Sequence, residues 1–321
     1  MKIMVLLVSL LTLISCSTER NADLATVSSD QQPVSAMDAT STIAPYTLPR
    51  SGAQVAEDLT AQYYDKAVDC GGPSRAAFLC SGVDVRGTGS GNGYDTWNPS
   101  ETAVKVGGVS FTFFRTDYKV RRLAKNFKHG FIFYPMMKRP TGKISVEILC
   151  FFPIDGESDN RPENGCGATP GKPMSDMCHR VGVETGGQWS AHYNKYGEHG
   201  ANGRGGCAMD TRKASNDHAG PNFYQGLIGG RDIAPKTFEK PNDLKHRVWD
   251  QDIASVLPIQ AFFYLDAAGL VLAKNDQRRF CEVTGQFMPI IQMTLPKTLQ
   301  QEMSFRFNSA DQLSVCGGDA R

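Results

Sequence analysis

The hydrophobic positions of this chain fall into short runs that are separated by long polar stretches. Near the start of the presumed folded part, Val55, Leu59, Tyr63 and Ala67 recur at four-residue spacing and therefore form one apolar stripe. This spacing predicts a helix over residues 52–67 whose apolar stripe faces a core.

Several apolar runs further along the chain predict strands. The run over residues 145–152 is nearly unbroken, which predicts a central strand buried on both faces. A helical pattern is visible at residues 188–196, where Trp189 is expected in the core and His192 on the helix, and a further pattern places His246 on a helix. The remaining strand runs are 77–86, 108–114, 130–135, 259–265 and 287–295, and a further helix is expected at 222–228.

Between these elements, residues 155–220 are rich in Gly, Asn, Asp and Pro and lack apolar periodicity. A long irregular stretch inside a compact domain is usually functional or pinned by cross-links, and this one contains Cys166, Cys178 and Cys207. The whole pattern predicts an α+β fold, with a mixed, curved β-sheet, flanking helices and disulfide staples.

The N-terminus predicts an exported lipoprotein. Residues 3–14 form an apolar run that is shorter than the ~20 residues of a membrane-spanning helix, but it fits the core of a signal peptide. The run ends in Leu13-Ile14-Ser15-Cys16, which resembles the bacterial lipobox, where a peptidase cuts before a lipid-modified cysteine. The alternative is an ordinary signal peptide followed by an incidental Cys16.

This N-terminus also predicts the domain organisation and the location. We expect a signal peptide over residues 1–15 and a disordered tether over 16–48, because that segment is rich in Ser, Thr, Ala and Asp. One α+β domain is expected over 49–321. Ser17 stands where an Asp would favour inner-membrane retention, so we expect the outer membrane or release outside the cell.

The charge of the chain argues against one class of partner. The formal net charge is +1 at pH 7, so there is no basic excess to hold phosphate backbones. Nucleic acid is therefore not expected as a partner. Membrane contact is expected only through the lipid anchor, because no later apolar stretch approaches the length of a spanning helix.

The cysteine count agrees with export. The chain has 9 cysteines, and setting Cys16 aside for lipid leaves an even number, which predicts four disulfides in an oxidising compartment. Loop-closure entropy favours the local pairs Cys70–Cys80 and Cys166–Cys178. The pairs Cys150–Cys207 and Cys281–Cys316 then remain. Zinc ligation is the competing reading, but no C-x-x-C or H-x-x-x-H spacing occurs, so we expect no metal.

Candidate chemistry concentrates around two of the predicted strands. Arg86 ends one strand, and Ser110 and Thr112 alternate on another and so share a face. With a later glutamate, this is the layout of arginine-specific ADP-ribosyltransferases. In those enzymes the guanidinium binds the phosphates of NAD, the serine supports the geometry of the site, and the glutamate stabilises the oxocarbenium-like ribosyl centre. Glu302, in Gln300-Gln301-Glu302, is the candidate acid. Alternatively, Arg86 pairs with a carboxylate and Glu302 is an exposed surface residue.

Four further residues are candidates for contact with NAD. Thr88 follows Arg86, and Trp97 lies in a loop between the two strands, where its ring can stack on adenine or nicotinamide or can cover an edge of the core. Asp276 and Gln277 form a polar pair that we place near a strand. There is no G-x-S-x-G, Walker or H-E-x-x-H motif, and no His pairs with a defined nucleophile.

At these positions the chain resembles the halovibrin family of secreted bacterial proteins. The resemblance covers roughly residues 60–310 and includes Trp97-Asn98-Pro99-Ser100, Cys150-Phe151-Phe152-Pro153-Ile154-Asp155 and residues 77–83, 86–88, 107–111, 130–135, 257–259, 261–264 and 276–277. It implies an ADP-ribosyltransferase or NAD glycohydrolase that cleaves the nicotinamide–ribose bond. NAD would be the substrate, and the acceptor would be water or an arginine of a protein. The alternative is a non-catalytic, disulfide-stapled surface-binding lipoprotein in which Trp97 anchors a ligand.

Overall fold

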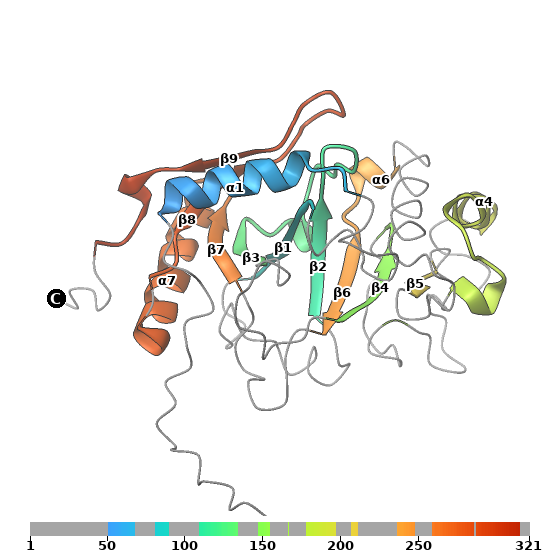
Figure 1. Cartoon of the computed structure of the whole chain (residues 1–321), viewed down its shortest axis with the longest axis horizontal. Coiled ribbons are helices and arrows are strands. Elements are labelled where there is room, and N and C mark those ends of the chain that lie inside the picture. The colour runs from blue at the N-terminus through green and yellow to red at the C-terminus, as the bar shows by residue number, and fades with distance from the viewer. Residues whose placement is uncertain are drawn as a thin grey trace, which may run out of the picture. The chain divides into compact units, whose positions relative to one another are not determined.

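The computed structural model describes residues 51–67, 81–89, 109–133, 147–154, 166, 178–196, 207–210, 236–247, 259–285 and 287–314. All of them belong to one compact unit, Pro45–Arg321. Figure 1 shows their arrangement, with a broad sheet, one long helix at each side of it and a smaller helical segment beyond β5. Among the described residues, no helix combines the length and apolar character needed to cross a membrane.

The described part contains both helices and strands, as expected. The strands are β1 Val83–Gly87, β2 Val109–Phe114, β3 His129–Phe133, β4 Glu147–Phe152, β5 Met209–Asp210, β6 Asp243–Arg247, β7 Ile259–Tyr264, β8 Ile290–Thr294 and β9 Ser304–Phe307. The α-helices are α1 Gly52–Tyr64, α4 Gly186–Tyr196, α6 Lys236–Glu239 and α7 Ala267–Thr284. Short 3₁₀ turns cover Ala124–Asn126, Cys178–Val181 and Ser309–Asp311.

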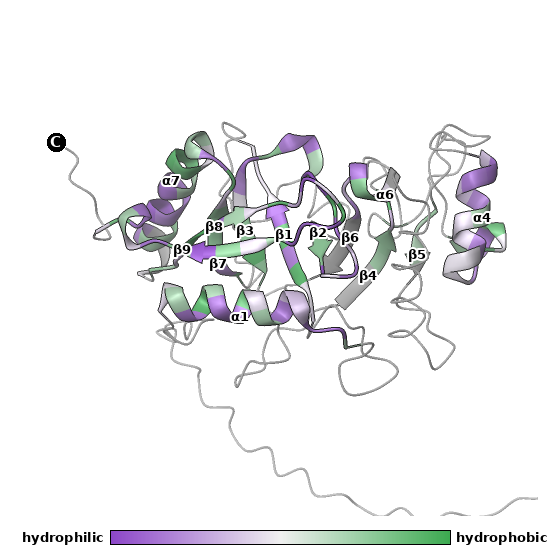
Figure 2. Ribbon diagram, turned by 90° about the horizontal axis from the view of Figure 1, so that it is seen from above, coloured by the Kyte–Doolittle hydropathy of each residue, from purple (hydrophilic) through white to green (hydrophobic). Residues whose placement is uncertain are grey.

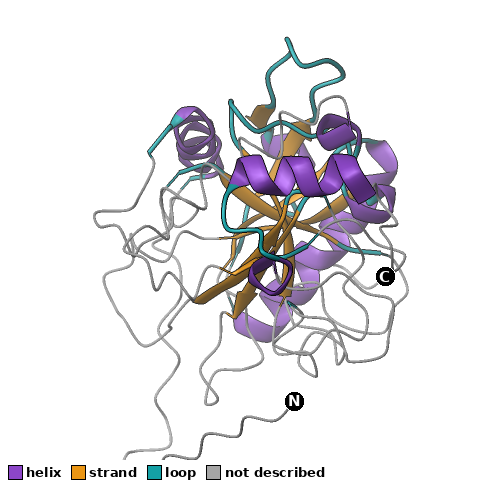
Figure 3. Cartoon of the chain, turned by 90° about the vertical axis from the view of Figure 1, so that its right-hand side faces the viewer, coloured by secondary structure: helices purple, strands orange, loops and turns teal. Residues whose placement is uncertain are grey.

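The strands form one 9-stranded sheet in the order β5-β4-β6-β2-β1-β3-β7-β8-β9. Neighbouring strands are antiparallel except β7 and β8, which run parallel. A parallel pair needs a crossover connection, and α7 supplies it. The strands fan across one another in Figure 3, as expected of a twisted sheet. The predicted α+β class, with a mixed sheet, flanking helices and disulfide staples, is confirmed.

Two helices cover opposite faces of the sheet (Figure 2). On one face, Gly52 of α1 lies against the ring of Phe307. On the other face, the ring of Phe280 on α7 contacts Phe262 on β7 at 5.8 Å. Side chains alternate between the faces along a strand, so the register of β1, β2 and the start of β3 assigns their residues to the α1 face or the α7 face.

Local capping explains where these two helices begin and end. Ser51 and Gln54 form a capping box at the start of α1. Val55, Leu59 and Tyr63 are buried as predicted, but α1 ends at Tyr64, because Asp65 is extended, and Ala67 lies outside the helix.

The longest helix, α7, was missed by the hydrophobic pattern. Its start and end are nevertheless encoded locally, since Asp266 caps the N-terminus and Gly285 adopts a left-handed conformation (φ 69°) at the C-terminus. The placement of Asp276 and Gln277 near a strand was therefore wrong, because both lie within α7.

Two other element predictions need correction. The run ending at Phe152 is buried on consecutive residues, as expected, but β4 lies next to the short edge strand β5 and is not central. His246 lies on strand β6, not on a helix. Trp189 is confirmed as a core residue of α4, where its indole donates a hydrogen bond to the carbonyl of Cys207 at 2.9 Å.

The disulfide pairing was partly wrong. The bonds are Cys150–Cys166 and Cys178–Cys207, in place of the predicted Cys166–Cys178 and Cys150–Cys207. Loop entropy considers only the distance along the chain. Here the pairing follows a tertiary contact: the amide of Cys178 donates a hydrogen bond to the carbonyl of Ala208, which places Cys178 beside Cys207. Cys281 is also disulfide-bonded.

Some sequence predictions lie outside the described residues. These are Trp97, the helix at 222–228, the signal peptide and tether, and the residues Cys16, Cys70, Cys80 and Cys316.

Candidate functional site

The two strands that carry Arg86 and Ser110 are neighbours in the sheet. They pair antiparallel with Val85 opposite Thr112, which places Ser110 opposite Gly87. Arg86 donates a hydrogen bond from Nη1 to the backbone carbonyl of Ser110 at 3.0 Å. The structure therefore brings these two predicted site residues together through the backbone.

Their side chains nevertheless point in opposite directions. Cross-strand partners share a face, so Ser110 and Thr112 lie with Val85 and Gly87 on the α1 face. Arg86 alternates with Val85 and lies on the α7 face. The hydroxyl of Ser110 is therefore not placed to brace a ligand held by the guanidinium of Arg86.

Glu302 lies in a different place, within a set of hydrogen bonds that we call the Glu302 network. Its carboxylate accepts hydrogen bonds from the hydroxyl of Tyr63 at 2.6 Å, from the hydroxyl of Thr116 at 3.3 Å and from the ammonium of Lys119. Burial and the bond to Glu302 raise the pKa of the Tyr63 hydroxyl. The Glu302 side chain, at 37% exposure, links the β8–β9 connection to α1 and to the segment after β2.

The Glu302 network and Arg86 occupy opposite ends of β2. Thr116 follows the last residue of β2, whereas Arg86 bonds to Ser110 near its start. The four steps along the extended chain from Ser110 to Phe114 span about 13 Å. Figure 1 shows the β8–β9 connection reaching over the end of β2. The structure therefore does not assemble Arg86, Ser110 and Glu302 into one site.

A second polar group lies on the α7 face, and we call it the β1–β3 polar cluster. It consists of Arg86 and Thr88 from β1 and the residue after it, His129 from β3 and Asp276 from α7. The amide of Thr88 donates to the carbonyl of His129 at 3.0 Å, which continues the β1–β3 pairing and sets the two side chains next to each other. Nε2 of His129 lies 3.6 Å from Oδ2 of Asp276.

The β1–β3 polar cluster contains donors whose bonding capacity is not used. Nε of Arg86 and the hydroxyl of Thr88, a residue only 3% exposed, are buried and have no hydrogen-bond partner among the described residues. Buried polar groups normally have partners, because leaving one unbonded costs about 1–3 kcal/mol. Two buried donors close together, one of them cationic, are suited to bind an anionic group.

Burial also lowers the pKa of the histidine in this cluster. His129 is 4% exposed, and burial lowers the pKa of its imidazole below the usual 6.5. The neutral form is therefore favoured at pH 7, with one nitrogen as a donor and the other as an acceptor. His129 has no signal in the sequence beyond its place before an apolar run, and it was not among the predicted candidates.

Asp84 precedes Arg86 by two positions and extends the polar row on the α7 face. It lies opposite Phe113 and is 4% exposed. Burial raises the pKa of its carboxyl well above the usual 3.8, which favours the protonated form. Its aromatic surroundings and its distance along β1 from Thr88 set it apart from His129 and Asp276.

Gln277, a predicted contact for NAD, makes its hydrogen bonds within the fold. Its amide nitrogen donates to the carbonyl of Met288 at 2.7 Å, and its amide oxygen accepts from the backbone of Leu313 at 2.9 Å. With no exposed surface, it joins α7 to the segments before β8 and after β9. Of the polar pair, only Asp276 reaches the β1–β3 polar cluster.

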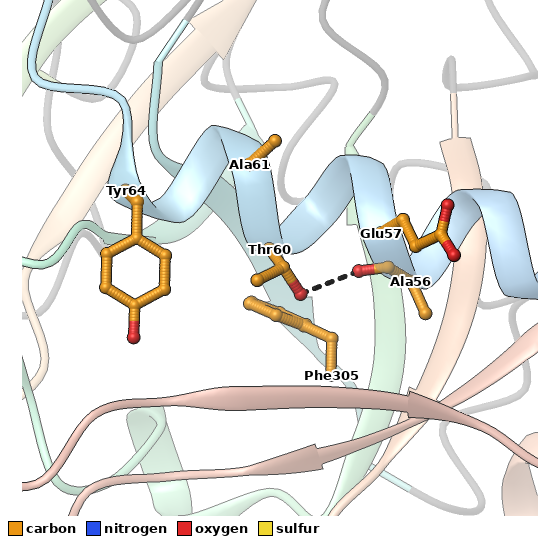
Figure 4. A pocket seen from close by; sticks show the side chains of 6 residues that line it. All are labelled: Ala56, Glu57, Thr60, Ala61, Tyr64 and Phe305. Atoms are coloured by element: carbon orange, nitrogen blue, oxygen red, sulfur yellow. Dashed lines mark hydrogen bonds between the residues drawn. The ribbon is translucent and has the colours of Figure 1, made fainter.

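A shallow groove of about 400 Å³ lies between α1 and β9, and Figure 4 shows its lining. The hydroxyl of Thr60 already donates to the carbonyl of Ala56 at 2.8 Å, and Glu57 is the one charged lining residue and is exposed. The other lining residues are Ala61, Tyr64 and Phe305. This groove therefore offers apolar surface but few groups for chemistry.

Comparison with known proteins adds no constraint on the assignment. No protein-family model matches the chain, and no curated protein matches it. The described residues contain no group of three or more His, Cys, Asp or Glu side chains placed to hold a metal ion.

Proposed function

We propose that this chain is an NAD-consuming enzyme that cleaves the bond between nicotinamide and ribose. The products would be nicotinamide and ADP-ribose, the latter free or attached to an acceptor such as an arginine. The site would be the β1–β3 polar cluster, in place of the combination of Arg86, Ser110 and Glu302. The resemblance of the sequence to halovibrins suggests the reaction class, and the geometry of the cluster suggests the site.

One observation carries this proposal, namely the two buried donors of the cluster. The Nε of the Arg86 guanidinium is buried and has no hydrogen-bond partner within the described ranges. The hydroxyl of Thr88 lies on the same face, two positions along the chain, or about 7 Å. A diphosphate group offers several anionic oxygens, so one such group can accept hydrogen bonds from both donors.

The carboxylate of Asp276 is the group of the cluster that could stabilise positive charge on the ribose. As nicotinamide leaves, positive charge develops on the ribose, and a nearby carboxylate stabilises that charge more strongly where water is excluded. Asp276 lies beside His129, and its side chain is 17% exposed, so it is largely shielded and yet within reach of the cluster surface. In this proposal Asp276 takes the role that the sequence suggested for Glu302.

The test measures nicotinamide release from NAD, and turnover of an etheno-NAD reporter, by the full-length chain with its disulfides oxidised. Arg86→Ala is expected to lower kcat/KM by about 100-fold or more, because it removes the charged donor for the phosphates. The kcat/KM of Arg86→Lys should lie between those of the native chain and Arg86→Ala, because lysine keeps the positive charge but lacks the planar guanidinium that can donate two parallel hydrogen bonds. Arg306→Ala, on the exposed part of β9, is the matched control.

The outcomes separate the two parts of the proposal. No nicotinamide release by the oxidised native chain would overturn the NAD-consuming function. Release that Arg86→Ala leaves at the native rate would overturn the site but leave the reaction class standing. Thermal unfolding of each variant is measured in parallel, because Arg86 also bonds to the backbone of Ser110.

A further inference from the structure

We infer that His129, held by Asp276, removes the proton from the acceptor water, so that cleavage of NAD by this chain ends in hydrolysis. This inference rests on the proposed function and assigns a proton acceptor within the same site. Neither the ADP-ribosyltransferase layout recognised in the sequence nor the predicted site residues include a histidine.

The geometry supports this role through the two nitrogens of one imidazole. Nε2 of His129 lies 3.6 Å from Oδ2 of Asp276, which is an ion-pair distance just longer than a hydrogen bond, and we assign the proton of the neutral imidazole to that side. Nδ1 then carries the lone pair, and among the described residues it makes no hydrogen bond. A carboxylate that orients one nitrogen and leaves the other to accept a proton is the arrangement that general-base histidines require.

The position of His129 fits the ligand that Arg86 and Thr88 would hold. Thr88 and His129 are cross-strand neighbours on the α7 face, so their Cβ atoms lie about 5 Å apart. A diphosphate bound by Thr88 and Arg86 would thus place the adjoining ribose next to the imidazole. The four side chains come from β1, the residue after it, β3 and α7, which are joined in the sheet or packed on it.

The proposed step balances without any further reactant. The water oxygen forms a bond to C1′ of the ribose, and the bond from C1′ to the nicotinamide nitrogen breaks. The bonding electron pair leaves with nicotinamide, whose ring becomes neutral, and the water proton passes to Nδ1 of His129. The imidazolium formed in this way is stabilised by the carboxylate of Asp276 and later releases its proton to solvent.

Several charged or titratable groups lie near His129 in the chain or in the sheet. Arg86 lies on the same face of β1, Lys128 precedes His129 in the chain, and Tyr264 lies opposite it on β7 with its hydroxyl donated to Asp311. Burial lowers the pKa of His129 below 6.5, so the imidazole is ready to accept a proton at neutral pH. Activity should therefore fall on the acid side of pH 6.5, as His129 becomes protonated.

The experiment compares the native full-length chain with His129→Gln, Asp276→Asn and the matched control His192→Gln, whose histidine lies on α4. Nicotinamide release is measured with and without sodium azide. Azide is an anionic nucleophile with no proton to lose, so its attack on C1′ needs no base. His129→Gln is expected to lose roughly 100-fold or more of its hydrolysis. Azide should restore nicotinamide release in this variant, with ADP-ribosyl azide as the product.

Each outcome decides between a catalytic and a structural role. Azide rescue in His129→Gln supports the inference. Asp276→Asn also loses the carboxylate proposed for the ribosyl centre, so its rate should fall, and its residual activity should have an acid limb at lower pH because losing the carboxylate disfavours imidazolium. A loss of activity that azide does not rescue would mean that the pair only joins α7 to β3. Native-like hydrolysis by His129→Gln would overturn the inference alone, whereas no release by the native chain would overturn the proposed function as well.

Discussion

Two polar groups lie at opposite ends of β2, and they differ in how their hydrogen-bonding capacity is used. In the Glu302 network, the carboxylate accepts hydrogen bonds from Tyr63, Thr116 and Lys119, so each of these side chains has a partner. In the β1–β3 polar cluster, Nε of Arg86 and the hydroxyl of Thr88 are buried without a hydrogen-bond partner in the described residues.

The difference separates a structural role from a functional one. A network whose members satisfy one another stabilises the chain segments it joins, here α1, the segment after β2 and the β8–β9 connection. A cluster with buried, unbonded donors reduces stability in the absence of a ligand, and only a bound partner can recover that free energy. We therefore expect substitutions in the Glu302 network to affect folding and those in the β1–β3 polar cluster to affect binding.

The largest effect on stability is expected for Glu302→Ala. The change leaves the ammonium of Lys119, a side chain 5% exposed, without its carboxylate. We expect a loss of about 1–3 kcal/mol in the free energy of unfolding, measured by denaturant titration. NAD cleavage by the folded fraction should be retained. Glu282→Ala, at an exposed position on α7, is the control. Loss of cleavage without loss of stability would return Glu302 to the active site.

The same network has a defined pH dependence. Burial raises the pKa of Glu302, but hydrogen bonds from Lys119, Tyr63 and Thr116 outweigh burial and hold it below the usual 4.5. A carboxyl with a depressed folded-state pKa stabilises the fold above its unfolded-state pKa, and this contribution is lost as pH falls through the folded-state pKa. The stability difference between the native chain and Glu302→Ala should therefore shrink below pH 4.5.

A smaller effect on stability is expected for Asp84→Asn, which should stabilise the fold at neutral to basic pH. Burial raises the pKa of this carboxyl, so the folded state holds a proton that the unfolded state releases above its pKa near 3.8. Stability from this group is therefore present at low pH and declines as pH rises towards the folded-state value. Asparagine avoids that loss, so we expect a thermal midpoint about 2–4 °C higher at pH 8 and no gain near pH 3.5. A lower midpoint at pH 8 would show that ionised Asp84 stabilises the fold.

The smallest effect is expected for Thr88→Val, and it tests the cluster directly. Valine removes a buried hydroxyl that has no partner in the described residues, so the ligand-free protein should gain about 0.5–1 kcal/mol. The same change removes a proposed donor to the diphosphate, so KM for NAD should rise. Stability is measured by thermal unfolding and KM from initial rates. A stability loss together with an unchanged KM would contradict both assignments.

The elements that the sequence predicted well are those whose pattern is local. The apolar stripe of Val55, Leu59 and Tyr63 identified α1, and short apolar runs identified β2, β3, β7 and β8. Helix α7 was missed because its apolar residues are grouped mainly at 270–273 and 280–281, with the polar stretch 274–279 between them. Its caps, Asp266 and Gly285, were the local signals that could have revealed it.

The candidate site was predicted in part, for a physical reason that concerns strand pairing. Arg86 and Thr88 were identified from their position at the end of a strand, and Asp276 as part of a polar pair placed near a strand. The register of β1 and β2 is not visible in either strand alone, yet it places Ser110 on the face opposite Arg86. The pairing of His129 with Asp276 joins residues from β3 and α7, which no spacing rule connects.

The sequence by itself therefore determined the secondary structure of most described strands, the fold class and the presence of disulfides, because these depend on residue type and on short-range periodicity. Only the tertiary structure decided which face each polar side chain occupies, which cysteines pair and which carboxylate lies beside His129. Those outcomes depend on the register between strands and on the packing of α7 against β3. They are long-range contacts, whose free energy is not contained in any single segment of the chain.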